Sequence, residues 1–252
     1  MPNSLPLQEQ QIVLTGTNMT RSVSSRITDL GGKVFHLPLI TVHEVELPGD
    51  TQLIKQAMKY EWLIFTSQNA VQAFAHKLER SQQAKEDCLA KIAVVGEKTA
   101  QALEKLGFTI DFIPSTYSAD TFIKEFPSQV GQLNSCLFLK GSLAKDTIKE
   151  GLPFPVKEWI VYETIQTTEH VPVLKELIKQ SQDVTVIFAS PSAVEVFAKH
   201  VAPIIGWKGF KIAAIGHVTE TALQNVGATV DIKPAKYTMM AIIDELAKRK
   251  EL

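Results

Sequence analysis

The sequence lacks long apolar runs, the features of a secretory leader and an excess of charge of either sign. No apolar run reaches the roughly 18–20 residues that span a bilayer. The first residues, MPNSLPLQEQQ, have neither the basic nor the apolar segment of a signal peptide. The formal net charge of the 252 residues is −1, whereas proteins that bind nucleic acid nonspecifically carry a strong basic excess. These absences predict a cytoplasmic protein with no membrane and no nucleic-acid partner.

Cysteine is also scarce, and the sequence contains no metal-binding pattern. Cys88 and Cys136 belong to no Cys-x-x-Cys pair and have no neighbouring histidine. The six histidines are scattered and form neither His-x-x-x-His nor His-Glu-x-x-His. The sequence therefore predicts two free thiols and no bound metal.

Familiar catalytic and nucleotide-binding motifs are missing as well. Neither Gly-x-Ser-x-Gly nor a Gly-x-Gly-x-x-Gly after a predicted strand occurs. The stretch GEKT at residues 96–99 is similar to the end of a phosphate loop. However, position 91 is lysine where that motif has its first glycine, and Glu97 follows Gly96. These observations argue against a serine-hydrolase elbow, a Walker A loop and the usual dinucleotide fold.

What the sequence does contain is an internal repeat. Residues 91–114, KIAVVGEKTAQALEKLGFTIDFIP, match residues 211–234, KIAAIGHVTETALQNVGATVDIKP, at 11 of 24 positions without gaps. Just upstream, FTSQNAVQAFA at 65–75 matches FASPSAVEVFA at 188–198 at 6 of 11 positions. One supersecondary unit therefore occurs twice, and the repeat favours two domains over one.

Short apolar runs alternate with helical segments along the chain. This alternation is typical of parallel sheets covered by helices on both faces. Strands are predicted at 12–16, 33–42, 62–67, 92–96, 108–114, 136–141, 156–165, 184–190, 211–216 and 228–234. Helices are predicted at 20–30, 51–59, 69–78, 98–106, from 118 onward, and at 146–150, 171–180, 193–199, 219–225 and 239–250. Pro38 suggests that the strand at 33–42 bends or lies at a sheet edge. Periodicity alone leaves open whether the domains are tandem or the first domain is discontinuous.

The residues that follow the predicted strands are the candidate binding groups. In parallel α/β sheets ligands collect at the carboxyl ends of strands, where glycines admit close approach and helix N-termini attract anions. The alternative is that the hydroxylic residues serve only as helix N-caps. The candidates for substrate binding are Thr15, Ser67, Asn69, Gly96, Lys140, Gly141, Ser190, Ser192 and Thr219. Tyr162, at the predicted junction of the two halves, is a candidate catalytic phenol or a packed strand aromatic.

Taken together, these pieces resemble the uroporphyrinogen-III synthase family over nearly the whole chain. The resemblance rests on LGGKVFHLP, FTSQNAV, VVGEKTAQALEKLGF, the strand ending in Lys140-Gly141, IVYETI, FASPSAVEVF and AIGHVTETALQNVG, in this order and spacing. It implies two doubly wound, flavodoxin-like α/β domains with parallel sheets and a cleft between them. Domain 1 would be discontinuous, with residues 1–40 and 166–252, and domain 2 would hold residues 41–165. Two antiparallel connecting strands, near 37–45 and 159–168, would join them.

The resemblance also implies an activity. A lyase of porphyrin (haem) biosynthesis would cyclise the linear tetrapyrrole hydroxymethylbilane, with loss of water and inversion of ring D through a spiro intermediate. No cofactor is expected. The enzyme would act as a monomer, with hydroxymethylbilane synthase as a transient partner. Tyr162 matches the family tyrosine that assists departure of the hydroxyl, and Thr219 matches a threonine that contacts substrate.

The chain departs from the family pattern at the ends of two predicted strands. Relatives often have Arg where this chain has Gly16, and Arg-Gly where it has Lys140-Gly141. Both changes weaken bidentate recognition of carboxylates, and Arg21 is placed to compensate for the first. The alternatives from other classes are a cytosolic two-domain ligand-binding protein and a regulatory relative without turnover.

Overall fold

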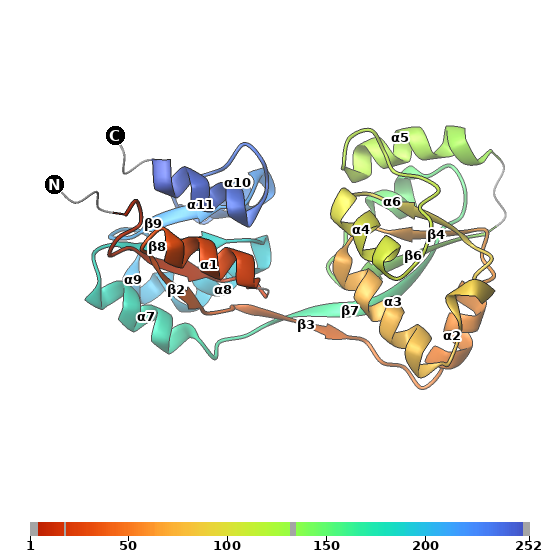
Figure 1. Ribbon diagram of the computed structural model, residues 1–252, viewed down its shortest axis with the longest axis horizontal. Coiled ribbons are helices and arrows are strands. Elements are labelled where there is room, and N and C mark those ends of the chain that lie inside the picture. The colour runs from red at the N-terminus through yellow and green to blue at the C-terminus, as the bar shows by residue number, and fades with distance from the viewer. Residues whose placement is uncertain (1–4, 18, 132–134, 249–252) are drawn as a thin grey trace. The chain divides into compact units, whose positions relative to one another are not determined.

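The computed structural model describes residues 5–17, 19–131 and 135–248. The chain divides into two compact units, which Figure 1 shows as separate sets of helices and strands. We call Met1–Thr41 with Ile165–Leu252 the terminal unit, and Val42–Thr164 the central unit. None of the helices described is long and apolar enough to cross a membrane.

The terminal unit contains a parallel sheet of order β2-β1-β8-β9. Helices α1 and α11 pack on one face, for example through Ile27 and Ile243, while α7, α8 and α10 pack on the other. Its strands are β1 (Gln11–Leu14), β2 (Lys33–His36), β8 (Val184–Phe188) and β9 (Lys211–Ala214). Its helices are α1 (Arg21–Asp29), α7 (Val171–Gln180), α8 (Pro191–His200), α9 (Ala202–Ile205), α10 (His217–Asn225) and α11 (Met239–Lys248). Residues 249–250 of the helix predicted at 239–250 lie outside the described residues.

The central unit has a sheet of order β3-β7-β6-β4-β5, in which β7, β6, β4 and β5 run parallel. Helices α2, α3 and α4 cover one face, and α5 and α6 cover the other with Phe126 and Ile148. Its strands are β4 (Trp62–Phe65), β5 (Lys91–Val94) and β6 (Cys136–Gly141), together with β3 (Ile40–Glu44) and β7 (Lys157–Gln166), which each share two residues with the terminal unit. Its helices are α2 (Asp50–Ala57), α3 (Gln68–Arg80), the short 3₁₀ helix η1 (Lys85–Asp87), α4 (Glu97–Lys105), α5 (Ala119–Val130) and α6 (Thr147–Gly151). The predicted α/β class with parallel sheets is confirmed.

The single strand predicted at 33–42 is wrong. Pro38 has no N–H to donate to a ladder, and the chain forms β2 before it and β3 after it, in different sheets. The hydrogen bonds of β3 and β7 run in antiparallel register. Val45 N donates to Val161 O at 3.0 Å, and Thr167 N donates to Leu39 O at 3.0 Å.

The strands predicted at 108–114 and 228–234 are also wrong, because each segment forms only one isolated bridge, to Ala93 or to Ala213. In the central unit the carboxylate of Asp111 accepts the Ile92 N–H at 2.8 Å. That N–H is therefore not available to a backbone carbonyl, and the ladder stops. Residue 231 accepts from residue 212 in the same way, at 2.7 Å.

Candidate active site

Tyr162 of β7 lies beside the carboxyl end of β6, where the pairing register shifts and Gly141 stands opposite Tyr162. The hydroxyl of Ser67 donates to Tyr162 Oη at 3.1 Å. Ser67 is also the N-cap of α3, because its Oγ accepts the Ala70 N–H at 3.1 Å. The phenol is thus held by a hydroxyl that is itself fixed to the first turn of a helix.

Gly141 is buried directly against the tyrosine ring. A Cβ atom at this position would lie 2.5 Å from Tyr162 Cε2 and 2.6 Å from Tyr162 Oη. Those separations are far below van der Waals contact, so any larger residue would displace the ring. Glycine at the end of β6 is therefore required by the position of the phenol.

Lys140, the preceding residue, is not available as an anion-binding ammonium. Its side chain is buried, and its Nζ donates to Glu158 at 2.7 Å and to Asp146 at 3.1 Å. Burial acts to lower the pKa of Lys140, but the hydrogen bonds that it donates to these two carboxylates raise the pKa above its usual value. Lys140 therefore fixes the end of β6 to β7, instead of pointing a free charge at a ligand.

Two further predicted residues lie at the same edge of the central sheet. Val95 N donates to Phe65 O at 3.1 Å, so the ends of β4 and β5 are adjacent. Asn69 is half-buried in the first turn of α3. Gly96 is the N-cap of α4 and has no atom within 4 Å of its Cβ position, so the backbone there is open to a ligand.

The terminal unit carries the remaining predicted residues after β1, β8 and β9. Thr15 is fully buried, and its hydroxyl donates to Ile187 O at 2.8 Å, so it acts within the fold. Ser190 caps α8 by accepting the Ala193 N–H at 3.3 Å. Ser192 is half-buried in the first turn of α8.

Thr219, in the first turn of α10, differs from Thr15. It is only 3% exposed, and its hydroxyl has no hydrogen bond to any residue in the described part of the chain. The hydroxyl is not one of the fully buried side-chain atoms that lack a hydrogen-bond partner, so it reaches solvent at the start of α10 and is accessible to a ligand oxygen. Arg21 is exposed in the first turn of α1.

No cluster of three or more His, Cys, Asp or Glu side chains that could hold a metal occurs among the residues described. A sequence model described as uroporphyrinogen-III synthase HemD matches residues 21–244. The chain belongs to the uroporphyrinogen-III synthase family. The recognition made from the motifs is therefore confirmed.

Individual relatives agree with this assignment. A uroporphyrinogen-III synthase from Chlorobaculum parvum is 30% identical over 182 residues, which are 70% of this chain and 74% of that protein. One from Synechococcus elongatus is 26% identical over 250 residues, 94% of each chain. The fold is similar to a mutant uroporphyrinogen III synthase from Thermus thermophilus, with a TM-score of 0.66, 16% identity and 96% and 98% coverage of this chain and that chain. A Helicobacter pylori uroporphyrinogen-III synthetase gives a TM-score of 0.65, 18% identity and 95% and 99% coverage.

Sequence reasoning missed a buried ion cluster in this synthase-family chain. Lys77 of α3 is completely buried and donates to Val45 O at 2.6 Å. Its ammonium also pairs with Glu44 at 3.1 Å and with Asp50 at 2.5 Å, and Arg80 binds Glu44 as well. The cluster fixes β3 and the segment after it to α3. A buried lysine is rare, and nothing in the spacing of Lys77 separates it from surface lysines.

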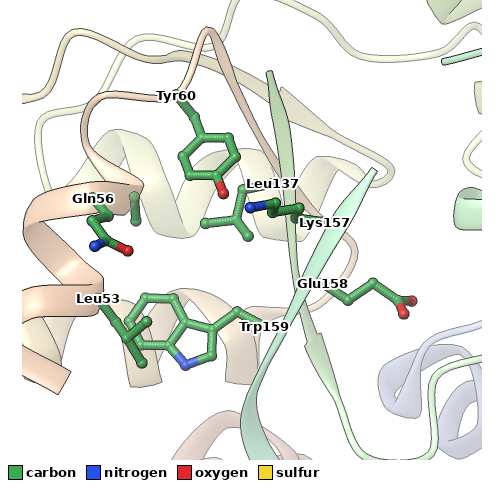
Figure 2. Close-up of a pocket in the computed structure, with 8 residues that line it drawn as sticks. Leu53, Gln56, Tyr60, Leu137, Lys157, Glu158 and Trp159 are labelled. Carbon is green, nitrogen blue, oxygen red and sulfur yellow. The ribbon is translucent and has the colours of Figure 1, made fainter. Parts of the chain in front are cut away.

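A separate pocket of about 190 Å³ lies near the amino ends of β6 and β7, on the side of the central sheet that α2 covers. Figure 2 shows Tyr60, Gln56 and Lys157 directed toward its centre above the ring of Trp159. Glu158 points away from the pocket and pairs with Lys140 and Lys149. The Tyr162 hydroxyl lies beside the opposite, carboxyl end of β6, so this pocket is distinct from the candidate active site.

Proposed function

We propose that this chain converts hydroxymethylbilane to uroporphyrinogen III, as a lyase of tetrapyrrole biosynthesis. The supporting observation is the phenol of Tyr162, held by Ser67 over Gly141 at the carboxyl edge of the central sheet, in a chain of the uroporphyrinogen-III synthase family. The two units would act as the two domains predicted at 1–40 with 166–252 and at 41–165.

The direction of one hydrogen bond makes Tyr162 suited to be a proton donor. Ala70 N–H donates to Ser67 Oγ, and Ser67 Oγ–H donates to Tyr162 Oη. The proton of the phenol is then free to point at a ligand. Successive hydrogen bonds in one direction polarise each other, which makes the last proton a better donor. In our proposal this proton is donated to the hydroxyl that leaves ring A as water.

The remaining steps need little from side chains. Loss of water leaves an electrophilic azafulvene, which the substituted carbon of ring D attacks to give the spiro intermediate. Fragmentation and reclosure then invert ring D. The protein would favour this route over direct closure by holding one conformation of the chain of rings. Its residues supply a proton and positions, and the bilane supplies both the nucleophile and the leaving group.

The carboxylates of the substrate would bind at the starts of helices. The first turns of α3, α4, α8 and α10 follow Ser67, Gly96, Ser190 and Gly216, and unpaired backbone N–H groups at such turns attract anions. Asn69, Ser192 and Thr219 would add side-chain contacts. Lys140 would fix the end of β6 and Thr15 the end of β1, because their polar side-chain atoms are already bonded within the protein.

The experiment is a coupled assay with two readouts. A deaminase generates hydroxymethylbilane, the protein is added, and the oxidised products are separated into I and III isomers. We expect mainly the III isomer with the wild type, whereas spontaneous closure gives the I isomer.

Variants assign the role of the phenol. Tyr162→Phe should slow formation of the III isomer by about 10²–10⁴-fold, the range for one general acid, and Ser67→Ala should slow it less. Tyr60→Phe, in the separate pocket, is the matched control and should retain the wild-type rate. Full activity of Tyr162→Phe would remove the phenol from the mechanism. Binding of the bilane with only I isomer formed would contradict the enzyme and favour a ligand-binding protein.

A further inference from the structure

A tyrosine ring lies on a glycine twice in this molecule, once in each unit. All 13 glycines lie in the described part of the chain, and among them only Gly141 and Gly216 have an aromatic ring of a described residue at the place where a Cβ would stand. The first pair, with Tyr162, belongs to the candidate active site. In the second, a Cβ at Gly216 would lie 3.0 Å from Cδ2 and Cγ of Tyr237.

The surroundings of Tyr237 hold its ring in place and leave it accessible. Gly216 is buried at the carboxyl end of β9, while Tyr237 is 50% exposed. The ring of His217 lies 5.5 Å from the Tyr237 ring, at 45°. The next residue, Thr238, accepts the Ala241 N–H at 3.2 Å at the start of α11, which fixes the loop. One side of the ring therefore packs on the glycine, and half of the residue remains open to solvent.

The repeat provides an internal comparison. Tyr117 occupies the same place after Gly96 as Tyr237 does after Gly216, and Ser118 caps α5 as Thr238 caps α11. Yet nothing lies within 4 Å of the Cβ position of Gly96, so Tyr117 does not pack on its glycine. Only the second copy forms a fixed aromatic surface. We call Gly216, His217 and Tyr237 the aromatic shelf.

We propose that the aromatic shelf stacks against one pyrrole ring of a carboxylated oligopyrrole and so helps to set the conformation of the bound chain of rings. Flat rings bind well to aromatic faces. A tyrosine ring that already packs on a glycine loses little conformational entropy when a ligand stacks on it. The hydroxyl of Thr219, two residues after His217, is available to an oxygen of the same ligand. The inference rests on the proposed function for the identity of the ligand, and it adds a binding residue that does no chemistry.

Three variants and one matched control test the shelf in the coupled assay. Tyr237→Leu removes the aromatic face and should raise KM by about two- to tenfold, the range for an aromatic pair, with kcat nearly unchanged. Tyr237→Phe keeps the face and should retain the wild-type KM. Gly216→Ala should raise KM by displacing the ring, since the φ of −169° at Gly216 is compatible with alanine. Tyr117→Leu, at the equivalent position of the other copy, should leave KM unchanged.

Uroporphyrin III, an octacarboxylated macrocycle of four pyrroles, separates this inference from the proposed function. Its Kd, measured by calorimetry, should rise about as much as KM in Tyr237→Leu and should not change in Tyr117→Leu. If the wild type binds uroporphyrin III, Tyr237→Leu raises the Kd, and no III isomer is formed, the proposed function fails while the shelf stands. If the wild type is active and Tyr237→Leu keeps both KM and Kd, or if Tyr117→Leu has the same effect, the shelf is refuted. Circular dichroism of each variant verifies that it is folded.

Discussion

The two units use the same scaffold but place their glycine–tyrosine pairs at different points of it. The sheet order β2-β1-β8-β9 of the terminal unit corresponds to β7-β6-β4-β5 of the central unit. In the central unit the glycine ends the strand β6 and the tyrosine belongs to β7. In the terminal unit the glycine follows β9, and the tyrosine comes from the loop before α11. The central phenol is tied to a serine, whereas the terminal ring is half-exposed.

The backbone contacts of the repeat, in contrast, are nearly identical. Val94 N donates to Phe112 O at 2.9 Å, and Ala214 N donates to Ile232 O at 2.9 Å. These bonds satisfy buried backbone groups, and any copy of the unit needs them. The glycine–tyrosine pairs near the strand ends are not shared in this way, and there the copies differ. In our proposal this division lets one unit supply a proton donor and the other a stacking surface.

The largest expected effect concerns stability in the central unit. Replacing Lys77 with alanine leaves Glu44 and Asp50 without their buried cation. Breaking a buried ion pair in this way costs about 3–5 kcal/mol. Urea unfolding of Lys77→Ala should show a loss of this size in the free energy of unfolding.

The terminal unit provides the control for that measurement. Arg26 pairs with Asp244 at 3.0 Å, and both side chains are more than 40% exposed. Exposed pairs contribute about 0–1 kcal/mol. Equal losses for Arg26→Ala and Lys77→Ala would show that the buried cluster has no special role in the stability of the central unit.

The second effect separates the two glycine–tyrosine pairs by kinetics. Gly141→Ala should move the Tyr162 ring and lower kcat by about 100-fold or more, because proton transfer depends on position. Gly216→Ala should act mainly on KM. Gly49→Ala, where no atom lies within 4 Å of the Cβ position, should change neither. The proposed division of roles would be wrong if both shelf and active-site variants changed the same kinetic constant.

The third effect should be alike in the two units. Asp111 and Asp231 each accept a backbone N–H of the neighbouring strand. Replacing either with alanine should cost about 1–3 kcal/mol, the cost of leaving a backbone group without its acceptor, and asparagine should recover part of it. Thermal unfolding of the four variants measures this. A large loss for one aspartate and none for the other would contradict the equivalence of the copies.

The smallest effect is a pH dependence confined to the central unit. Burial acts to raise the pKa values of Glu44 and Glu158, but hydrogen bonds from Arg80, Lys77, Lys140 and Lys149 hold both below the usual 4.5. A lowered carboxyl pKa stabilises the fold above the unfolded value, and this contribution is lost as pH falls through the folded value. Hydrogen exchange of β6 should therefore accelerate below pH 4.5 more than that of β8. Glu158→Gln should reduce the difference, and equal acceleration would argue against it.

The sequence by itself determined the class of fold and the strand-to-helix turns that contribute residues to the candidate site. The alternation of apolar runs and helical segments indicates which residues are buried, and the direct repeat indicates that one unit occurs twice. Glycines and hydroxyls after strands mark places where the backbone turns into a helix, because these requirements are local. The motifs in order were enough to predict the family.

Only the tertiary structure decided which of these residues face each other. Ser67 and Tyr162 are 95 positions apart, and their contact depends on the register of β6 against β7. The same register pairs Lys140 with Glu158. The ammonium of Lys140 is therefore not free to bind an anion. Tyr117 and Tyr237 are equivalent in sequence, yet only Tyr237 packs on its glycine. Such contacts depend on distances between segments that are remote in the chain, and residue periodicity carries no information about those distances.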